Sequence, residues 1–153
     1  MNTAKFQESI YIPASPETVY QLLADYRVGH PSILPKPYFA DLRVVEGGYG
    51  DGTLIEVDME VFGVKRSMRM QVSEPEPGHI LAEKDVDTGT ETEFIFEAQG
   101  EGCSLTIRTK MNFADGLGGY LEKLTTPMIT RRIYRMELQN IVAHLQEAEM
   151  KIA

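Results

Sequence analysis

Hydrophobic and polar residues alternate along most of this chain, and the alternation predicts its secondary structure. In residues 4–12, Phe6, Ile10 and Ile12 lie on one side of an extended backbone and polar residues lie on the other. This period of two is typical of a half-buried β-strand. Residues 39–113 keep nearly the same period, interrupted by turns rich in glycine and proline, and they predict six further strands in an antiparallel meander.

The predicted strands have one apolar and one polar face. The apolar positions are Ile55, Val57, Met59, Val61, Val64, Met68, Met70, Val72, Phe94, Phe96, Leu105, Ile107 and Met111. Their neighbours in sequence are mostly charged, as at Glu56, Asp58 and Glu60. We therefore expect one face of the sheet to cover the core and the other, including Asp58 and Glu60, to meet water.

A short helix is expected after the first strand. Ser15 is a favourable N-cap residue and Pro16 is suited to the first helical position, so the helix should begin at Pro16. It should end before the prolines of residues 30–37, because each proline removes a donor and restricts the residue before it. That segment predicts a shaped loop or a short turn.

A long helix is predicted over residues 120–150, with a kink or a division near residues 123–127 caused by Pro127. One apolar stripe at helical spacing comprises Tyr120, Leu124, Tyr134, Leu138, Ile141, Leu145 and Ala148, and a second, roughly opposite, comprises Ile129, Ile133 and Met136. Either Pro127 rotates the two halves so that both stripes are buried, which we favour, or the second stripe contacts another subunit or a hydrophobic partner. Monomer and homodimer both remain open.

The order of these elements predicts an α+β domain spanning residues 1–153. A curved seven-stranded antiparallel sheet would surround the long C-terminal helix, with one or two short helices after strand one. This is the helix-grip arrangement. Such a curled sheet leaves an interior that side chains fill only partly, and sites of this kind suit apolar ligands.

Composition excludes several classes of partner. The formal net charge of −8 disfavours nucleic acid, because phosphate backbones would be repelled. The single cysteine, Cys103, permits no internal disulfide and reads as a small buried hydrophobe. No stretch approaches the roughly 20 apolar residues that span a bilayer, so no integral membrane association and a cytoplasmic location are expected.

Three segments carry a resemblance to a known family. They are the run from Ser9 to Tyr26 (SIYIPASPETVYQLLADY), the run from Glu46 to Thr53 (EGGYGDGT), and the run from Arg135 to Ile141 (RMELQNI). In this order they resemble the polyketide cyclase/dehydrase and lipid-transport proteins of the START-like, or SRPBCC, superfamily. The His30–Pro35 segment is most similar to bacterial members without an assigned activity. The resemblance implies a helix-grip fold and a ligand such as a lipid, plant hormone or polyketide, with catalysis in a minority of members.

The chain departs from this family in one respect. Tyr20 stands where members often have tryptophan, and the chain has no tryptophan. This difference leaves the expected fold intact and the ligand specificity open.

Two arginines occupy positions that are otherwise apolar. Arg66 is in phase with Val64 and Met68, so it is either an anchor for a ligand carboxylate or carbonyl or, as we slightly favour, a strand-end side chain reaching out to water. Arg131 shares the stripe of Tyr134. It either contacts a polar ligand group or a developing oxyanion, or it pairs with an acidic residue at the surface.

The remaining candidates are a histidine and three tyrosines. His30 lies among prolines and is a candidate proton shuttle, although a structural role is more common for a lone loop histidine. Tyr26, Tyr120 and Tyr134 offer phenol groups to a ligand or complete the core. The three histidines have no metal-ligand spacing, and the glycines of residues 47–52 lie between strands, so we expect no metal, no cofactor and no phosphate loop.

Three functions follow from these candidates. The leading hypothesis is binding of a hydrophobic or amphipathic small molecule, lipid- or polyketide-like, in an internal cavity walled by Met59, Met68, Met70, Phe94, Phe96 and Met111. The second is an enzyme of the aromatase/cyclase or dehydratase type that uses cavity arginine, histidine or tyrosine. The third is a protein-interaction module with a collapsed cavity.

Overall fold

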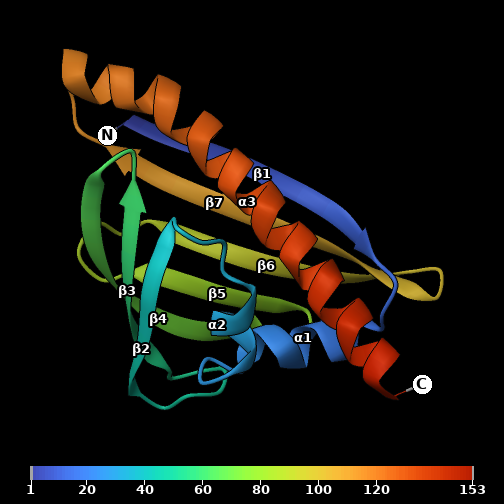
Figure 1. The fold of residues 1–153 in the computed structure, drawn as a ribbon. Helices are drawn as coiled ribbons and strands as arrows, with labels where there is room; N and C mark the ends of the chain where they lie inside the picture. The colour runs from blue at the N-terminus through green and yellow to red at the C-terminus, as the bar shows by residue number, and fades with distance from the viewer. Residues whose placement is uncertain (1, 153) are drawn as a thin grey trace.

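The computed structural model describes residues 2–152 and contains a seven-stranded antiparallel sheet in the order β1-β7-β6-β5-β4-β3-β2. The strands are β1 (Asn2–Ile12), β2 (Phe39–Glu46), β3 (Leu54–Val61), β4 (Val64–Glu76), β5 (Ile80–Asp85), β6 (Glu91–Gln99) and β7 (Gly102–Phe113). The helices are α1 (Pro16–Ala24), α2 (Gly29–Ile33) and α3 (Leu117–Ile152). The predicted helix-grip fold is confirmed: the sheet is strongly curved and α3 crosses its concave side (Figure 1).

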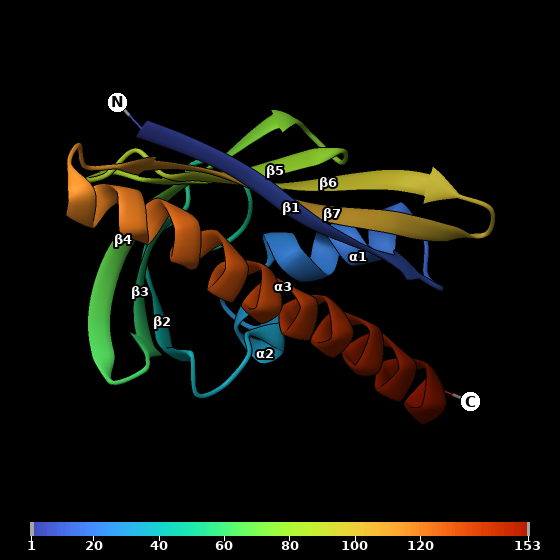
Figure 2. The same ribbon diagram turned by 90° about the horizontal axis from the view of Figure 1, so that it is seen from above.

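Strands β2 to β6 each pair with the next strand in sequence, which accounts for the short connections between them. Strand β1 instead pairs with β7 at the far edge of the sheet. The connection from β1 to β2 therefore passes from one edge to the other, and it carries α1 and α2. Figure 2 shows these two helices on the same side of the sheet as α3.

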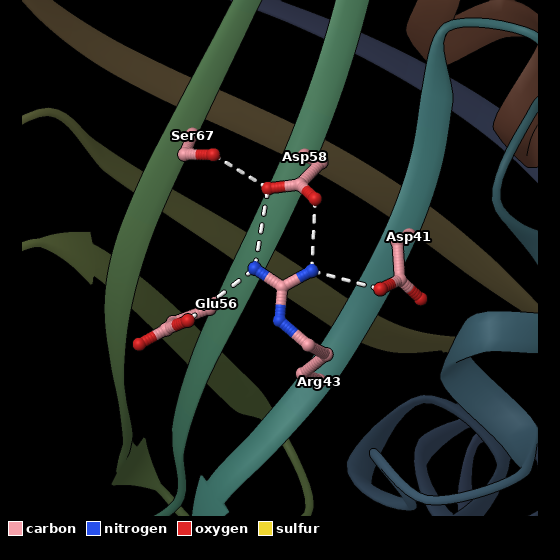
Figure 3. A network of polar contacts seen from close by, with 5 residues as sticks. All are labelled: Asp41, Arg43, Glu56, Asp58 and Ser67. Carbon is pink, nitrogen blue, oxygen red and sulfur yellow. Dashed lines mark hydrogen bonds and ion pairs between the residues drawn. The ribbon is translucent and has the colours of Figure 1, made fainter.

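The outer face of the sheet is polar, as the alternation predicts. On β2 and β3 the guanidinium group of Arg43 donates to Asp41 and Asp58 at 2.8 Å each, and Ser67 donates to Asp58 (Figure 3). The hydrogen bonds from Arg43, and to a smaller extent that from Ser67, lower the pKa of Asp58 to about 2. Asp58 therefore belongs to an exposed charge network and not to a catalytic carboxylate pair.

Helix α1 begins where the sequence predicts. Pro16 occupies its first turn, and the Ser15 hydroxyl accepts a hydrogen bond from the backbone N–H of Thr18 at 3.1 Å. This bond satisfies one of the N–H groups that the first turn leaves without an intrahelical partner.

Replacing Ser15 with alanine should lower the free energy of unfolding by about 1 kcal/mol, because the N-cap acceptor is lost. Urea unfolding followed by circular dichroism measures this change. Ser104→Ala, on β7, is the control for removing a hydroxyl away from a helix end, because the Ser104 hydroxyl makes no hydrogen bond within the described residues. An equal loss in both variants would contradict a capping role for Ser15.

The proline-rich segment that follows is more regular than predicted. Residues Gly29–Ile33 form helix α2, so His30 lies on a short helix and not in a loop. Pro31 is tolerated because it lies in the first turn, where its missing N–H has no intrahelical acceptor. Gly29 allows α2 to pack closely, since a Cβ atom there would lie 2.2 Å from the Leu22 carbonyl oxygen.

Helix α3 is continuous from Leu117 to Ile152, so the predicted division near residues 123–127 is wrong. Pro127 is accommodated inside the helix, and the first turns run at an angle to the rest (Figure 1). Bending is the usual response of a helix to an internal proline. The hydroxyl of Thr125 donates to the Leu121 carbonyl at 3.0 Å in the same region, a contact that also favours a bend.

The bend divides the predicted stripes of α3. Tyr134, Leu138 and Ile141 are buried as expected, but Tyr120 and Leu124 are 54% and 52% exposed. In the N-terminal half the inward positions belong instead to the second stripe, at Ile129 and Ile133. One straight helical wheel therefore assigns the wrong face to Tyr120 and Leu124, which precede Pro127.

The interior of the sheet is a conventional apolar core. Cys103 is fully buried in it and is a free thiol, as its small hydrophobic character predicts. Within residues 2–152, no helix has the length and hydropathy needed to span a bilayer.

Candidate functional site

A pocket of about 290 Å³ lies between the concave face of the sheet and α3. Most of its wall is apolar, and half of the apolar residues come from alternate positions of β3 and β4, because every second side chain of a strand points to the same face. The apolar lining residues are Leu34, Phe39, Leu42, Ile55, Val57, Met59, Val61, Val64, Met68, Met70, Phe94, Met111, Ile129 and Ile133.

Helix α3 lines the pocket at intervals of three and four residues. Thr126, Ile129, Thr130, Ile133, Tyr134 and Glu137 face the pocket, as expected for one face of a helix. The exposure of the lining residues distinguishes the mouth of the pocket from its inner end. Val64 is 65% exposed and belongs to the mouth, whereas Glu137 is 2% exposed and belongs to the inner end.

The inner end contains three polar side chains that lie close together: Tyr26, His30 and Glu83. The phenol of Tyr26 donates to Glu83 Oε2 at 2.7 Å, and His30 Nε2 lies 3.7 Å from the same oxygen. His30 Nδ1 lies 2.8 Å from the carbonyl oxygen of Leu23, which can only accept, so Nδ1 carries the proton of that bond. Burial and the Glu83 carboxylate raise the pKa of Tyr26 well above its ordinary value.

Local backbone structure fixes this group. Asp25 ends α1, and its side chain accepts hydrogen bonds from the N–H groups of Arg27 and Val28 at 3.1 and 3.2 Å. The resulting turn carries Tyr26 inward, where its ring stacks on His30 with centroids 4.6 Å apart. His30 in turn meets the Phe94 ring edge-on at 5.5 Å.

Tyr134 is held by hydroxyl groups of the sheet. Its phenol oxygen lies 2.6 Å from the hydroxyl of Thr109 and 3.4 Å from that of Thr92. The two threonines lie 2.8 Å from each other. Burial raises the pKa of Tyr134 to about 12, so its phenol stays neutral and can donate or accept a hydrogen bond at the pocket wall.

Glu137 is the most unusual residue of the pocket. Its side chain is buried on α3, yet no hydrogen bond joins its carboxyl group to another residue within the described part of the chain, 2–152. Burial, and secondarily the nearby Glu83, raise its pKa to about 8. Glu137 is therefore largely protonated at neutral pH, and its carboxyl group is an available donor or proton source.

The structure places eight of the twelve candidate residues in the pocket lining. These are Arg66, His30, Tyr134, Met59, Met68, Met70, Phe94 and Met111. The sequence offers two alternatives for Arg66, a side chain facing the ligand or one reaching out to water. In the structure it lines the pocket and is also exposed, at the mouth. Tyr26 lies behind the lining and acts through Glu83.

The other three candidates lie elsewhere. Arg131 does not line the pocket. Its Nε donates to Glu8 at 2.8 Å, beside Arg135, so it pairs with an acidic residue at the surface. Tyr120 is exposed on the first turns of α3, and Phe96 lies in the core, packed edge-on against Tyr20 with centroids 4.9 Å apart.

Sequence reasoning missed the two glutamates, although a signal for each is present. Glu83 follows buried Leu81 by two residues on β5, so it shares the apolar face. Glu137 follows Ile133 by four residues and Tyr134 by three, so it shares the inner face of α3. An acidic residue in phase with apolar neighbours, like a basic one, therefore indicates a side chain that faces the interior.

The acidic and histidine residues of the pocket do not form a metal site. Within the residues that the structure describes, no three His, Cys, Asp or Glu side chains are grouped to hold a metal ion.

Several solved structures resemble this one, although a comparison with curated proteins found no significant match. The solution structure of the KanY protein is 27% identical, with a TM-score of 0.83, covering 95% of this chain and 99% of that one. TTHA0849 from Thermus thermophilus is 20% identical, with a TM-score of 0.78 and coverage of 95% and 99%.

The aromatase/cyclase Zhui from a Streptomyces species has the same fold at 14% identity, with a TM-score of 0.78 and coverage of 99% and 97%. The family model described as polyketide cyclase / dehydrase and lipid transport matches residues 3–146, nearly the whole chain. The chain therefore belongs to the polyketide cyclase/dehydrase and lipid-transport family, and it has that family's helix-grip fold.

Proposed function

We propose that this protein binds an amphipathic small molecule in the pocket between the sheet and α3. The observation that carries the proposal is the contrast between the apolar walls and the buried polar inner end formed by His30, Glu83, Tyr134 and Glu137. An apolar ligand body would replace water along the walls, and a polar group would find hydrogen-bonding partners at the inner end.

The walls suit ligands of variable shape. Met59, Met68, Met70 and Met111 all line the pocket, and methionine side chains adapt to irregular surfaces. The volume of about 290 Å³ is at the lower end of small-molecule sites, so a compact ligand of one or two rings is favoured. An open pocket of this size gives no support to the alternative of a collapsed interaction module.

A second candidate is acid–base catalysis of the cyclase or dehydratase type. It is favoured by the convergence of a mainly protonated carboxyl group, Glu137, with the Tyr26–Glu83–His30 group at one end of the pocket. Glu137 would donate a proton to a carbonyl or hydroxyl oxygen, and His30 or Glu83 would accept one. Ligand binding remains the primary proposal, because a cyclase or a dehydratase must also bind its substrate before it reacts.

Blocking the pocket should weaken binding of a neutral fluorescent probe. Ile129→Trp places a larger side chain in the lining, whereas Leu124→Trp makes a comparable change on an exposed part of the same helix. We expect Ile129→Trp to weaken binding of N-phenyl-1-naphthylamine by about tenfold or more, and Leu124→Trp to leave it unchanged.

Fluorescence titration measures both affinities, and circular dichroism confirms that both variants fold. Equal affinity of the parent protein and a folded Ile129→Trp variant would refute this site. Native mass spectrometry after gentle purification complements the titration, because a reproducible co-purifying mass would define the ligand class.

A further inference from the structure

We propose that the inner end of the pocket binds the ammonium group of an amphipathic organic cation, between the carboxyl groups of Glu137 and Glu83. The proposal rests on the proposed function and specifies its ligand class. The apolar part of such a ligand, an aromatic amine of one or two rings, would lie against the methionine and aliphatic walls.

The first support is the unpartnered carboxyl group of Glu137. This side chain is 2% exposed and lines the pocket, and it accepts or donates no hydrogen bond within residues 2–152. Every fully buried side-chain nitrogen or oxygen of those residues has a partner. The Glu137 oxygens therefore keep some accessible surface, and that surface opens on the pocket, where a ligand group would supply the missing partner.

The second support is the balance of charge around Glu137. In addition to burial, Glu83 on β5 raises the pKa of Glu137 electrostatically. Glu137 in turn contributes to the raised pKa of Tyr26, beyond α1, and of Tyr134, on α3 itself, so both phenols are close to it and neutral. His30 on α2 faces Glu83 and not Glu137. The inner end thus combines two carboxyl groups with neutral hydroxyls and one imidazole.

Within residues 2–152, no lysine or arginine of the pocket lining lies at the inner end to offset these carboxyl groups. Among the lining residues that the structure describes, Arg66 is the only arginine or lysine, and it is exposed at the mouth. Arg131 and Arg135 are bound to Glu8 outside the pocket. A ligand carboxylate would be repelled at the inner end, whereas an ammonium group would gain two acidic partners and the nearby rings of Phe94 and Tyr134.

Ammonium binding should release a proton from Glu137. Burial and Glu83 favour the protonated acid in the empty pocket, and a bound cation reverses this preference by stabilising the carboxylate. The proton passes to the solvent. Alkylamines, with pKa values near 10, stay charged over this range, so affinity should rise about tenfold per pH unit from pH 6 toward pH 8.

Three ligands that share the same naphthalene ring test the proposal: the amine 2-(1-naphthyl)ethylamine, the alcohol 2-(1-naphthyl)ethanol and the carboxylate 1-naphthaleneacetate. Calorimetric titration at pH 8 should show the amine binding about tenfold or more tighter than the alcohol, with the carboxylate weakest. In Glu137→Gln the amine should lose about tenfold or more, the alcohol should change by less than about twofold, and the steep pH dependence should disappear. Glu147→Gln, an exposed change on the same helix, should match the parent protein.

The outcomes separate the two proposals. If the alcohol binds as tightly as the amine, or the carboxylate binds best, the cation assignment is overturned while the pocket remains a ligand site. An unchanged amine affinity in Glu137→Gln overturns it as well. If none of the three ligands binds and the neutral naphthylamine probe also fails, both the cation assignment and the proposed function are refuted.

Discussion

Between pH 5 and pH 8, the stability advantage of Glu137→Gln over the parent protein should grow by about 3 kcal/mol. The carboxyl group of Glu137 has a pKa of about 8 in the folded protein and an ordinary value of 4.5 when it is exposed. At pH values between these two pKa values, Glu137 has lost its proton in the unfolded chain and keeps it in the folded protein. Stability of the parent protein therefore falls as the pH rises through this window. Glutamine carries no such proton, so its variant escapes the loss.

Urea unfolding at pH 5, 6, 7 and 8 measures the difference, with Glu147→Gln as the exposed control that should follow the parent protein at every pH. Parallel stability profiles for Glu137→Gln and the parent protein would show that Glu137 is not a neutral buried acid. A gain in stability on removing a buried acid is the behaviour expected of a residue retained for function at a cost in stability.

Leu105→Ala should lower the free energy of unfolding by about 2–5 kcal/mol, while Met59→Ala should lower it by much less. Leu105 is fully buried on β7, so alanine leaves a cavity that neighbouring side chains fill only in part. Met59 is only partly buried on β3 and already borders the pocket, so it gives up fewer packing contacts.

Chemical unfolding of both variants at one pH provides the comparison. The mutations remove side chains of similar size from two strands of the same sheet, so the difference reports how closely each site is packed. A loss at Met59 as large as that at Leu105 would mean that Met59 is packed in a closed core and that the pocket is smaller than the structure shows.

Much of the fold follows from periodicity. The alternation in β3 and β4 identifies the wall residues correctly, and Ser15 and Pro16 mark the start of α1. Such local patterns suffice because a strand exposes one face and buries the other. The helix at His30 is harder to predict from the sequence, because prolines disfavour a helix except in its first turn, where Pro31 lies.

The site was less predictable because it depends on how distant elements cross. Arg131 shares a helical stripe with Tyr134, but α3 also packs along β1, and Arg131 contacts Glu8 of that strand in place of the pocket. Conversely, Glu83 and Glu137 are far apart in the sequence, and only the packing of α3 on the sheet brings their charges together. Periodicity assigns a face to each residue and does not identify what lies opposite it.

The position of β1 at the edge beside β7 also has a consequence for biosynthesis. β1 leaves the ribosome before the other six strands, but its strand partner β7 is the last of the seven to be made, and the hydroxyl of Thr3 bonds to Asn112 across 109 residues. Closing so long a loop is entropically costly and slows folding. The N-terminal strand must therefore wait, with its apolar side uncovered, until nearly all of the sheet has emerged.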